Sequence, residues 1–230
     1  MTQQSIYCWD DTKNICNKYV PPPPKSIKYV YDNTIFKPTP FKATTLSITN
    51  IHIIDCGLSL IQDNPVLLNA GHETLPGGYV DKGYSGKEES IFRRTNCFQT
   101  LHISLYPIKS DELIYSSNIS VIKTIHWKYI HEPYKLSFIT CPVLNNNMCI
   151  TKKEEQLLGR KINHILQTAL YHGHHTIILT TLCDDLWYKK IQRVAYIYKE
   201  VLSEYMGVFK HIEFALNGDN YHIFKEVFKH

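Results

Sequence analysis

Between residues 76 and 95 the chain reads Pro76-Gly-Gly-Tyr-Val-Asp-Lys-Gly-Tyr-Ser-Gly-Lys-Glu-Glu-Ser-Ile-Phe-Arg-Arg-Thr95, a glycine turn followed by two adjacent carboxylates. Gly77 and Gly78 have no Cβ atom, so they can bring main-chain N–H groups against a ligand. The loop then enters an expected helix, whose first N–H groups point at an anion. With Glu88 and Glu89 beside them, these groups suit chemistry on a glycosidic bond next to a phosphate.

The same residues also fit a purely structural role. Ser85-Gly-Lys-Glu88 has the spacing of a capping box, in which Glu88 would return a hydrogen bond to the helix start and Glu89 would favour the helix dipole. Gly77-Gly78 could be an ordinary tight turn after Pro76. Spacing alone does not separate these alternatives.

The motif resembles the catalytic loop of the microbial-type poly(ADP-ribose) glycohydrolases, a branch of the macrodomain fold. That family has a Gly-Gly-Gly turn, then six to eight residues, then Gln-Glu-Glu. Here Gly77, Gly78 and Tyr79 take the turn, seven residues intervene, and Lys87-Glu88-Glu89 closes the motif. Weaker similarity to the family extends over residues 66–70, 112–117, 137–145 and 211–216.

One departure concerns a second glycine loop, which wraps the diphosphate in that family. Here the corresponding stretch reads Thr180-Thr-Leu-Cys-Asp-Asp-Leu-Trp187 and contains no glycine. Asp184 and Asp185 would repel a diphosphate, by roughly 1 kcal/mol in water at about 4 Å and by about 4 kcal/mol at the dielectric of a protein surface. Either the loop has moved or the ligand has changed. An alternative is that this acidic pair holds Mg²⁺ together with phosphate.

The resemblance assigns roles to the carboxylates. It implies Glu89 as the acid/base that protonates the departing oxygen and then activates water, and Glu88 as an anchor for a ribose hydroxyl. Lys87, in the place of the family's Gln, is expected to lower the pKa of its neighbours through its charge. The resemblance implies neither a cofactor nor a metal.

Further ligand contacts follow from the same resemblance. It implies that Asp55 takes the adenine amino group and that Asn69 fixes the distal ribose. Asn69 could instead cap the next loop, and the aromatic residues could pack in the core. The remaining implied contacts are Thr140 and Asn145 beside the ribose, and Trp187 or Tyr188 stacked on ribose or adenine.

Alternating apolar segments predict an α/β fold. Short apolar runs predict buried strands at residues 66–68, 136–139, 176–179 and 212–216, and a further strand at 46–54. Helical periodicity predicts helices at Lys152–Tyr171, opened by a Thr151–Glu154 capping box, and at about 191–205. Together with the resemblance, this predicts a three-layer α/β/α macrodomain-like sandwich with a mixed, mainly parallel sheet. Residues 69–78, 140–145 and 180–188 each follow a strand and should converge on one crevice.

The first 45 residues differ from the rest. Pro21–Pro24, with Pro38 and Pro40, favour a surface-wrapping arm over a helix. We therefore expect an N-terminal extension over residues 1–45 packed on a domain of residues 46–230. The pairs Arg93-Arg94 and Lys189-Lys190 and the stretch His172-Gly-His-His175 are expected on solvated faces.

The amino-acid composition argues against several classes of function. The 230 residues carry 25 basic and 21 acidic side chains, a scattered excess that does not predict nucleic-acid binding. Seven cysteines without a Cys-x-x-Cys pair are typical of reduced thiols inside a cell. The first residues have no basic region before an apolar core and no apolar run approaches membrane-spanning length, so we expect neither a signal peptide nor a membrane-spanning segment. We expect a soluble, monomeric protein of the cytoplasm or nucleus; its Lys, Ile, Asn and Tyr content is typical of AT-rich genomes such as those of some large viruses.

Two functions fit these observations. The first is an ADP-ribosyl glycohydrolase that cleaves the ribose bond of ADP-ribose polymers or of ADP-ribosylated protein. The second is a non-hydrolytic macrodomain-like module that binds ADP-ribose or a related nucleotide, and it is motivated by the missing second glycine loop.

Overall fold

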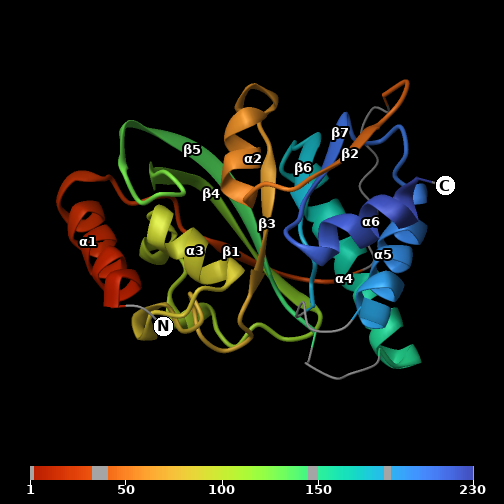
Figure 1. Cartoon of the computed structure of the whole chain (residues 1–230), viewed down its shortest axis with the longest axis horizontal. Coiled ribbons are helices and arrows are strands. Elements are labelled where there is room, and N and C mark those ends of the chain that lie inside the picture. The colour runs from red at the N-terminus through yellow and green to blue at the C-terminus, as the bar shows by residue number, and fades with distance from the viewer. Residues whose placement is uncertain (1–2, 33–40, 145–149, 184–187, 230) are drawn as a thin grey trace.

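A seven-stranded mixed sheet forms the centre of the computed structural model, which describes residues 3–32, 41–144, 150–183 and 188–229 (Figure 1). The strand order is β1-β4-β5-β3-β6-β7-β2. The pairs from β5 through to β2 are parallel, whereas β1–β4 and β4–β5 are antiparallel. The strands span β1 Ile27–Val30, β2 Thr45–Thr49, β3 Val66–Gly71, β4 Glu112–Lys123, β5 Tyr129–Pro142, β6 Thr176–Leu179 and β7 His211–Ala215.

Helices cover both faces of this sheet, which confirms the predicted three-layer fold (Figure 1). One apolar core joins the sheet to α4, α5 and α6, and a second core on the other face joins it to α1, α2 and α3. None of these described helices is long and apolar enough to cross a bilayer. The helices span α1 Gln3–Tyr19, α2 Ile53–Ser59, α3 Lys87–Arg94, α4 Lys152–Tyr171, α5 Tyr188–Ser203 and α6 Asp219–Phe228.

Local chemistry explains where the best-predicted elements begin and end. The Thr151 hydroxyl accepts from the Glu154 amide while the Glu154 carboxylate accepts from the Thr151 amide, so the predicted capping box opens α4. Strand β6 is buried along its whole length, as its apolar run predicts. Strand β3 is also wholly buried and extends past the apolar run to Asn69 and Gly71.

Two expectations about the N-terminal part are wrong. Residues 3–19 form a 17-residue helix in place of an arm, because Cys8, Trp9, Thr12 and Cys16 pack onto the domain while the prolines only follow the helix. The strand expected at 46–54 ends at Thr49, since the His52 side chain accepts from the Ile54 amide and starts α2. Pro38 and Pro40 lie outside the described residues. The division at residue 45 stays a prediction, although Ile27–Val30 is a strand of the common sheet.

Candidate active site

The two adjacent glutamates lie at the start of α3, buried against the end of β3. Glu88 and Glu89 are only 3% and 9% exposed. The helix begins at Lys87 with Gly86 as its N-cap residue, and no side chain caps it. The capping-box interpretation of Ser85 and Glu88 is therefore wrong, because the Glu88 carboxylate accepts its hydrogen bonds from other elements.

Glu88 is held by groups from β3 and the loop after it. Its Oε2 accepts from the His72 amide at 2.8 Å, and its Oε1 accepts from Asn69 Nδ2 at 3.3 Å. Burial raises the pKa of the Glu88 carboxyl to about 8; the charge of Glu89 adds to the rise, and the hydrogen bonds from His72, Asn69 and Gly77 oppose it. Burial therefore favours the protonated form of Glu88. The Lys87 ammonium hydrogen-bonds the Thr181 hydroxyl.

Glu89 is held by the glycine loop and the turn before its helix. Its Oε1 accepts from the Tyr79 amide at 3.1 Å. A methyl group at Gly78 would lie 2.7 Å from that Oε1, and a methyl group at Gly86 would lie 2.1 Å from Oε2. Glycine at both positions is thus what leaves room for the carboxylate.

The amides of the glycine turn serve the carboxylates. Gly77 and Gly78 both have positive φ, of 77° and 57°, which glycine adopts without strain. The Gly78 amide donates to the Leu75 carbonyl, and the amides of Gly77 and Tyr79 interact with Glu88 and Glu89. The loop therefore differs from the expected ligand cradle, because its main chain fixes the two acids in place.

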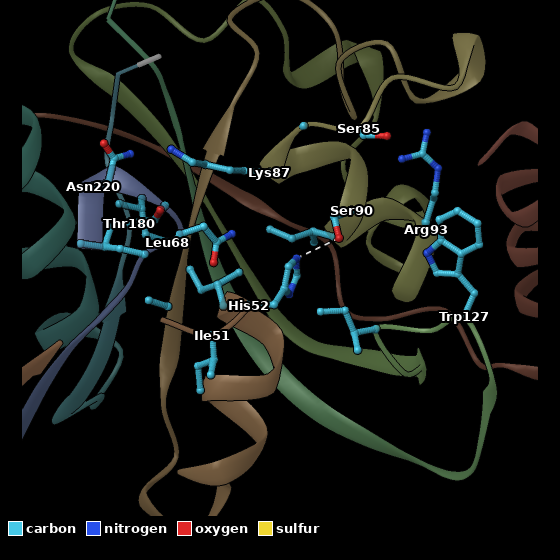
Figure 2. Close-up of a pocket in the computed structure, with 17 residues that line it drawn as sticks. Ile51, His52, Leu68, Ser85, Lys87, Ser90, Arg93, Trp127, Thr180 and Asn220 are labelled. Atoms are coloured by element: carbon cyan, nitrogen blue, oxygen red, sulfur yellow. Dashed lines mark hydrogen bonds between the residues drawn. The ribbon is translucent and has the colours of Figure 1, made fainter. Parts of the chain in front are cut away.

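Two adjoining cavities meet at the start of α3. The smaller, of about 270 Å³, is lined by Glu88, Glu89, Gly78 and His72. The larger, of about 430 Å³, lies between α2, α3 and the end of β7 (Figure 2). Gly86 and Lys87 line both cavities. One elongated ligand could therefore occupy both, with one end beside the glutamates.

Comparison with known proteins agrees with this geometry. Residues 17–124 match the family model described as microbial-type PARG, catalytic domain. This segment contains both glutamates and the glycine turn. The resemblance to the microbial-type PARG family is confirmed.

Solved PARG structures share the fold. The chain is 18% identical to poly(ADP-ribose) glycohydrolase from Thermomonospora curvata over 98% of its own length and 99% of that chain, with a TM-score of 0.81. It is 19% identical to the enzyme from Deinococcus radiodurans, solved in complex with ADP-ribose, over 83% of its own length and 85% of that chain, with a TM-score of 0.71. Another T. curvata structure contains the inhibitor ADP-HPD. No curated protein matches the chain.

Three residues expected at the ligand by PARG resemblance are engaged within the protein. Asn69 and Thr140 face each other across β3 and β5, both fully buried, and Asn69 Nδ2 donates to Thr140 Oγ1 at 3.2 Å. Asn69 thus orients Glu88. Asp55 lines neither cavity, because its carboxylate accepts two bonds from Arg94, at 2.6 and 3.0 Å.

The other expected ligand contacts fall where the structure gives no description. Asn145 and Trp187 lie outside the described residues, as do Asp184 and Asp185 of the divergent loop. Tyr188 begins α5, and nothing is described of its side chain. These positions remain predictions.

The surface positions predicted for several charged residues are wrong. Arg93 and Arg94 are fully buried, because Arg93 donates to the carbonyls of Ser5 and Tyr84 while Arg94 pairs with Asp55. Lys190 is buried as well. His174 is also buried, with its ring between the Tyr115 hydroxyl and the Asn64 carbonyl. Each partner is distant in sequence, so no local pattern identifies it.

Sequence reasoning missed His52 and Ser90, which lie together on the wall of the larger cavity (Figure 2). The available signal was weak. His52 precedes Ile53-Ile54 at a helix start, where a side chain with an acceptor atom caps the first turn.

Proposed function

We propose that this protein is an ADP-ribosyl glycohydrolase that cleaves the ribose glycosidic bond of ADP-ribose polymers or ADP-ribosylated protein. The observation that carries the proposal is the pair Glu88 and Glu89, buried in one cavity and each fixed by a separate set of amides. The PARG family match over residues 17–124 supports it.

In this proposal Glu89 transfers the protons. It gives a proton to the departing oxygen as the bond from that oxygen to the anomeric carbon breaks, and the resulting carboxylate then takes a proton from the water that attacks the oxocarbenium-like carbon. The Tyr79 amide holds Oε1 of Glu89, while Oε2 lies beside Gly86, a residue that lines both cavities. Glu88 is the anchor of the ribose hydroxyl. In its protonated form, which burial favours, Glu88 can donate to a hydroxyl oxygen of the ribose.

Replacing Glu89 by Gln tests this function. Glu89→Gln keeps the shape and the bond from Tyr79 but cannot exchange a proton, so release of ADP-ribose from a modified protein should slow roughly 10²- to 10⁴-fold. Affinity for free ADP-ribose, measured by titration calorimetry, should change little. The matched control is Glu73→Gln, which alters an exposed carboxylate and should leave the rate unchanged. Equal rates in Glu89→Gln and the unaltered protein would remove Glu89 from the mechanism.

A binding module without turnover is the second candidate. The observation favouring it is the sequence Thr180-Thr-Leu-Cys-Asp-Asp-Leu-Trp187, which lacks the glycines of the family's diphosphate loop. Titration with ADP-ribose beside a product assay separates the two functions. Binding with no product after long incubation favours the module.

The remaining predictions concern the setting of the activity. We propose a monomeric protein inside the cell, of viral origin, with no specific nucleic-acid target. The support is compositional: a net charge of +4 gives little attraction to nucleic acid, and seven unpatterned cysteines suit a reducing compartment.

A further inference from the structure

The larger cavity combines apolar and polar walls, a mixture that suits a heteroaromatic ring. Ile51, Ile53, Leu68, Ile91 and Leu216 supply its apolar surface. It meets the glutamate cavity at Gly86 and Lys87, so a group bound here would be the end of the ligand remote from the reacting ribose. Such a site gains its specificity from the few polar groups on its wall.

His52 is the best-defined of these polar groups. Its Nδ1 receives the Ile54 amide at 3.2 Å and Arg94 Nη1 at 2.8 Å (Figure 2 shows His52 beside α3). An amide and a guanidinium can only donate, so Nδ1 carries no proton. Burial, followed by the charge of Arg94, lowers the pKa of His52 to about 4. The neutral ring therefore holds its one proton on Nε2.

This tautomer fixes the polarity of the neighbouring hydroxyl. His52 Nε2 lies 2.8 Å from Ser90 Oγ, and since Nε2 carries the proton it donates to that oxygen. The Ser90 oxygen is thus an acceptor toward His52, and its own proton is left to point elsewhere. Among the described residues no acceptor for that proton is present, and Ser90 lines the cavity. The wall accordingly offers a donor to a ligand.

The acceptor that was expected at this site is used elsewhere. Asp55 was predicted to take an exocyclic amino group, yet its carboxylate is engaged by the same Arg94 that fixes His52. We propose that Ser90 is a specificity-determining residue that donates a hydrogen bond to an acceptor atom on the edge of a planar base, with His52 and Arg94 as positioning residues. This inference rests on the proposed function, because it concerns the base of the same ADP-ribose ligand.

A double-mutant cycle tests the assignment. Titration calorimetry would measure the binding of ADP-ribose, and of three analogues in which N1, N3 or N7 of the adenine is replaced by C–H, to the unaltered protein and to Ser90→Ala. Ser90→Ala should bind ADP-ribose about fivefold more weakly, the usual factor for one hydroxyl hydrogen bond. One analogue should show the same loss on the unaltered protein and no further loss on Ser90→Ala.

Two controls accompany the cycle. Ser203→Ala removes an exposed hydroxyl at the end of α5 that bonds only the Glu200 carbonyl, and it should bind all four compounds like the unaltered protein. Thermal unfolding checks that Ser90→Ala is folded. Nitrogen NMR of histidine-labelled protein should place the His52 proton on Nε2, and a proton on Nδ1 would overturn the inference.

The outcomes separate this inference from the function on which it rests. If the unaltered protein binds ADP-ribose and Ser90→Ala loses the same factor, or none, with every analogue, Ser90 does not read a ring atom and the inference alone fails. If the unaltered protein does not bind ADP-ribose, the proposed function and this inference fail together.

Discussion

At the scale of single residues, the position of Glu89 depends on glycines that leave room for its carboxylate. The backbone of Gly86 is extended, with φ −91° and ψ 178°, a conformation that alanine also adopts. Glycine is needed at position 86 for lack of space and not for its backbone conformation, because a Cβ atom there would overlap Glu89 Oε2. A carboxylate at the end of a flexible side chain moves aside at little cost in stability, but it then leaves its working position.

We therefore expect Gly86→Ala to lose activity while remaining folded. Release of ADP-ribose should fall roughly 10²-fold, since displacement by about 1 Å costs a factor of this size, whereas the thermal midpoint should shift little. The control is Gly159→Ala inside α4, where the new Cβ would meet Val201 Cγ2 at an ordinary 3.9 Å. That variant should gain roughly 0.5–1 kcal/mol of stability at full activity. A fully active Gly86→Ala protein would contradict the assigned position of Glu89.

At the scale of elements, α1 supports the helix that carries the glutamates. The Thr12 hydroxyl donates to the Arg93 carbonyl at 2.6 Å, and Arg93 Nε donates back to the Ser5 carbonyl at 3.0 Å. Trp9 Nε1 donates to Asp81 in the short turn Val80–Lys82 after the glycine loop. Lys123, at the end of β4, donates to the Cys8 carbonyl and the Thr12 hydroxyl. The N-terminal helix thus contacts both segments that hold the acids.

Removal of the buried ammonium of Lys123 tests this support. Lys123→Met removes the hydrogen bonds to the Cys8 carbonyl and the Thr12 hydroxyl and breaks the ion pair with the partly exposed Asp11, so unfolding by urea should need about 2–4 kcal/mol less. Limited proteolysis should cut within residues 3–19 sooner, and activity should fall with it. Lys13→Met on the same helix removes partly exposed ion pairs with Asp10 and Asp81 and should cost less than about 1 kcal/mol. Equal losses in the two variants would show that α1 is held by its apolar side chains alone.

How much of these elements the sequence predicts depends on how far away their partners lie. The bounds of α4 and β6 follow from local signals, a capping box and an apolar run. The placing of Glu88 and Glu89 follows from the motif. By contrast, α1 is held by Lys123 and Arg93, which lie far along the chain. His52 is held by Ser90, 38 residues away, and by Arg94, 42 residues away. Local hydrophobic periodicity does not predict contacts between residues so far apart in the sequence.

At the scale of the whole molecule, buried ionisable groups change the stability in opposite senses as the pH varies. Burial lowers the pKa of His52 and of His164 to about 4, so their contribution is present above about 6.5 and is lost as pH falls through 4. Glu88 acts in the opposite sense. Its pKa rises from 4.5 to about 8, so its contribution is present below 4.5 and is lost as pH rises through 8.

Glu88→Gln should remove the loss of stability that Glu88 causes as the pH rises. The unfolding free energy of this variant relative to the unaltered protein should increase by a few kcal/mol between pH 5 and pH 8, because one pKa unit corresponds to about 1.4 kcal/mol. Urea unfolding at pH 5, 6.5 and 8 measures the difference. A difference that stays constant across this range would show that Glu88 ionises normally in the folded protein.

The pairing of β2 with β7 joins residues 45–49 to residues 211–215, and the larger cavity takes part of its wall from the carboxyl ends of these two strands and the segments that follow them. During synthesis on the ribosome, a nascent chain that has not yet reached residue 211 has β2 without its neighbouring strand β7. It also lacks the part of the larger cavity's lining that follows Thr180 in the sequence. Translation products that end between residues 95 and 211 therefore contain the complete glutamate motif but lack the complete cavity that would hold a nucleotide beside it.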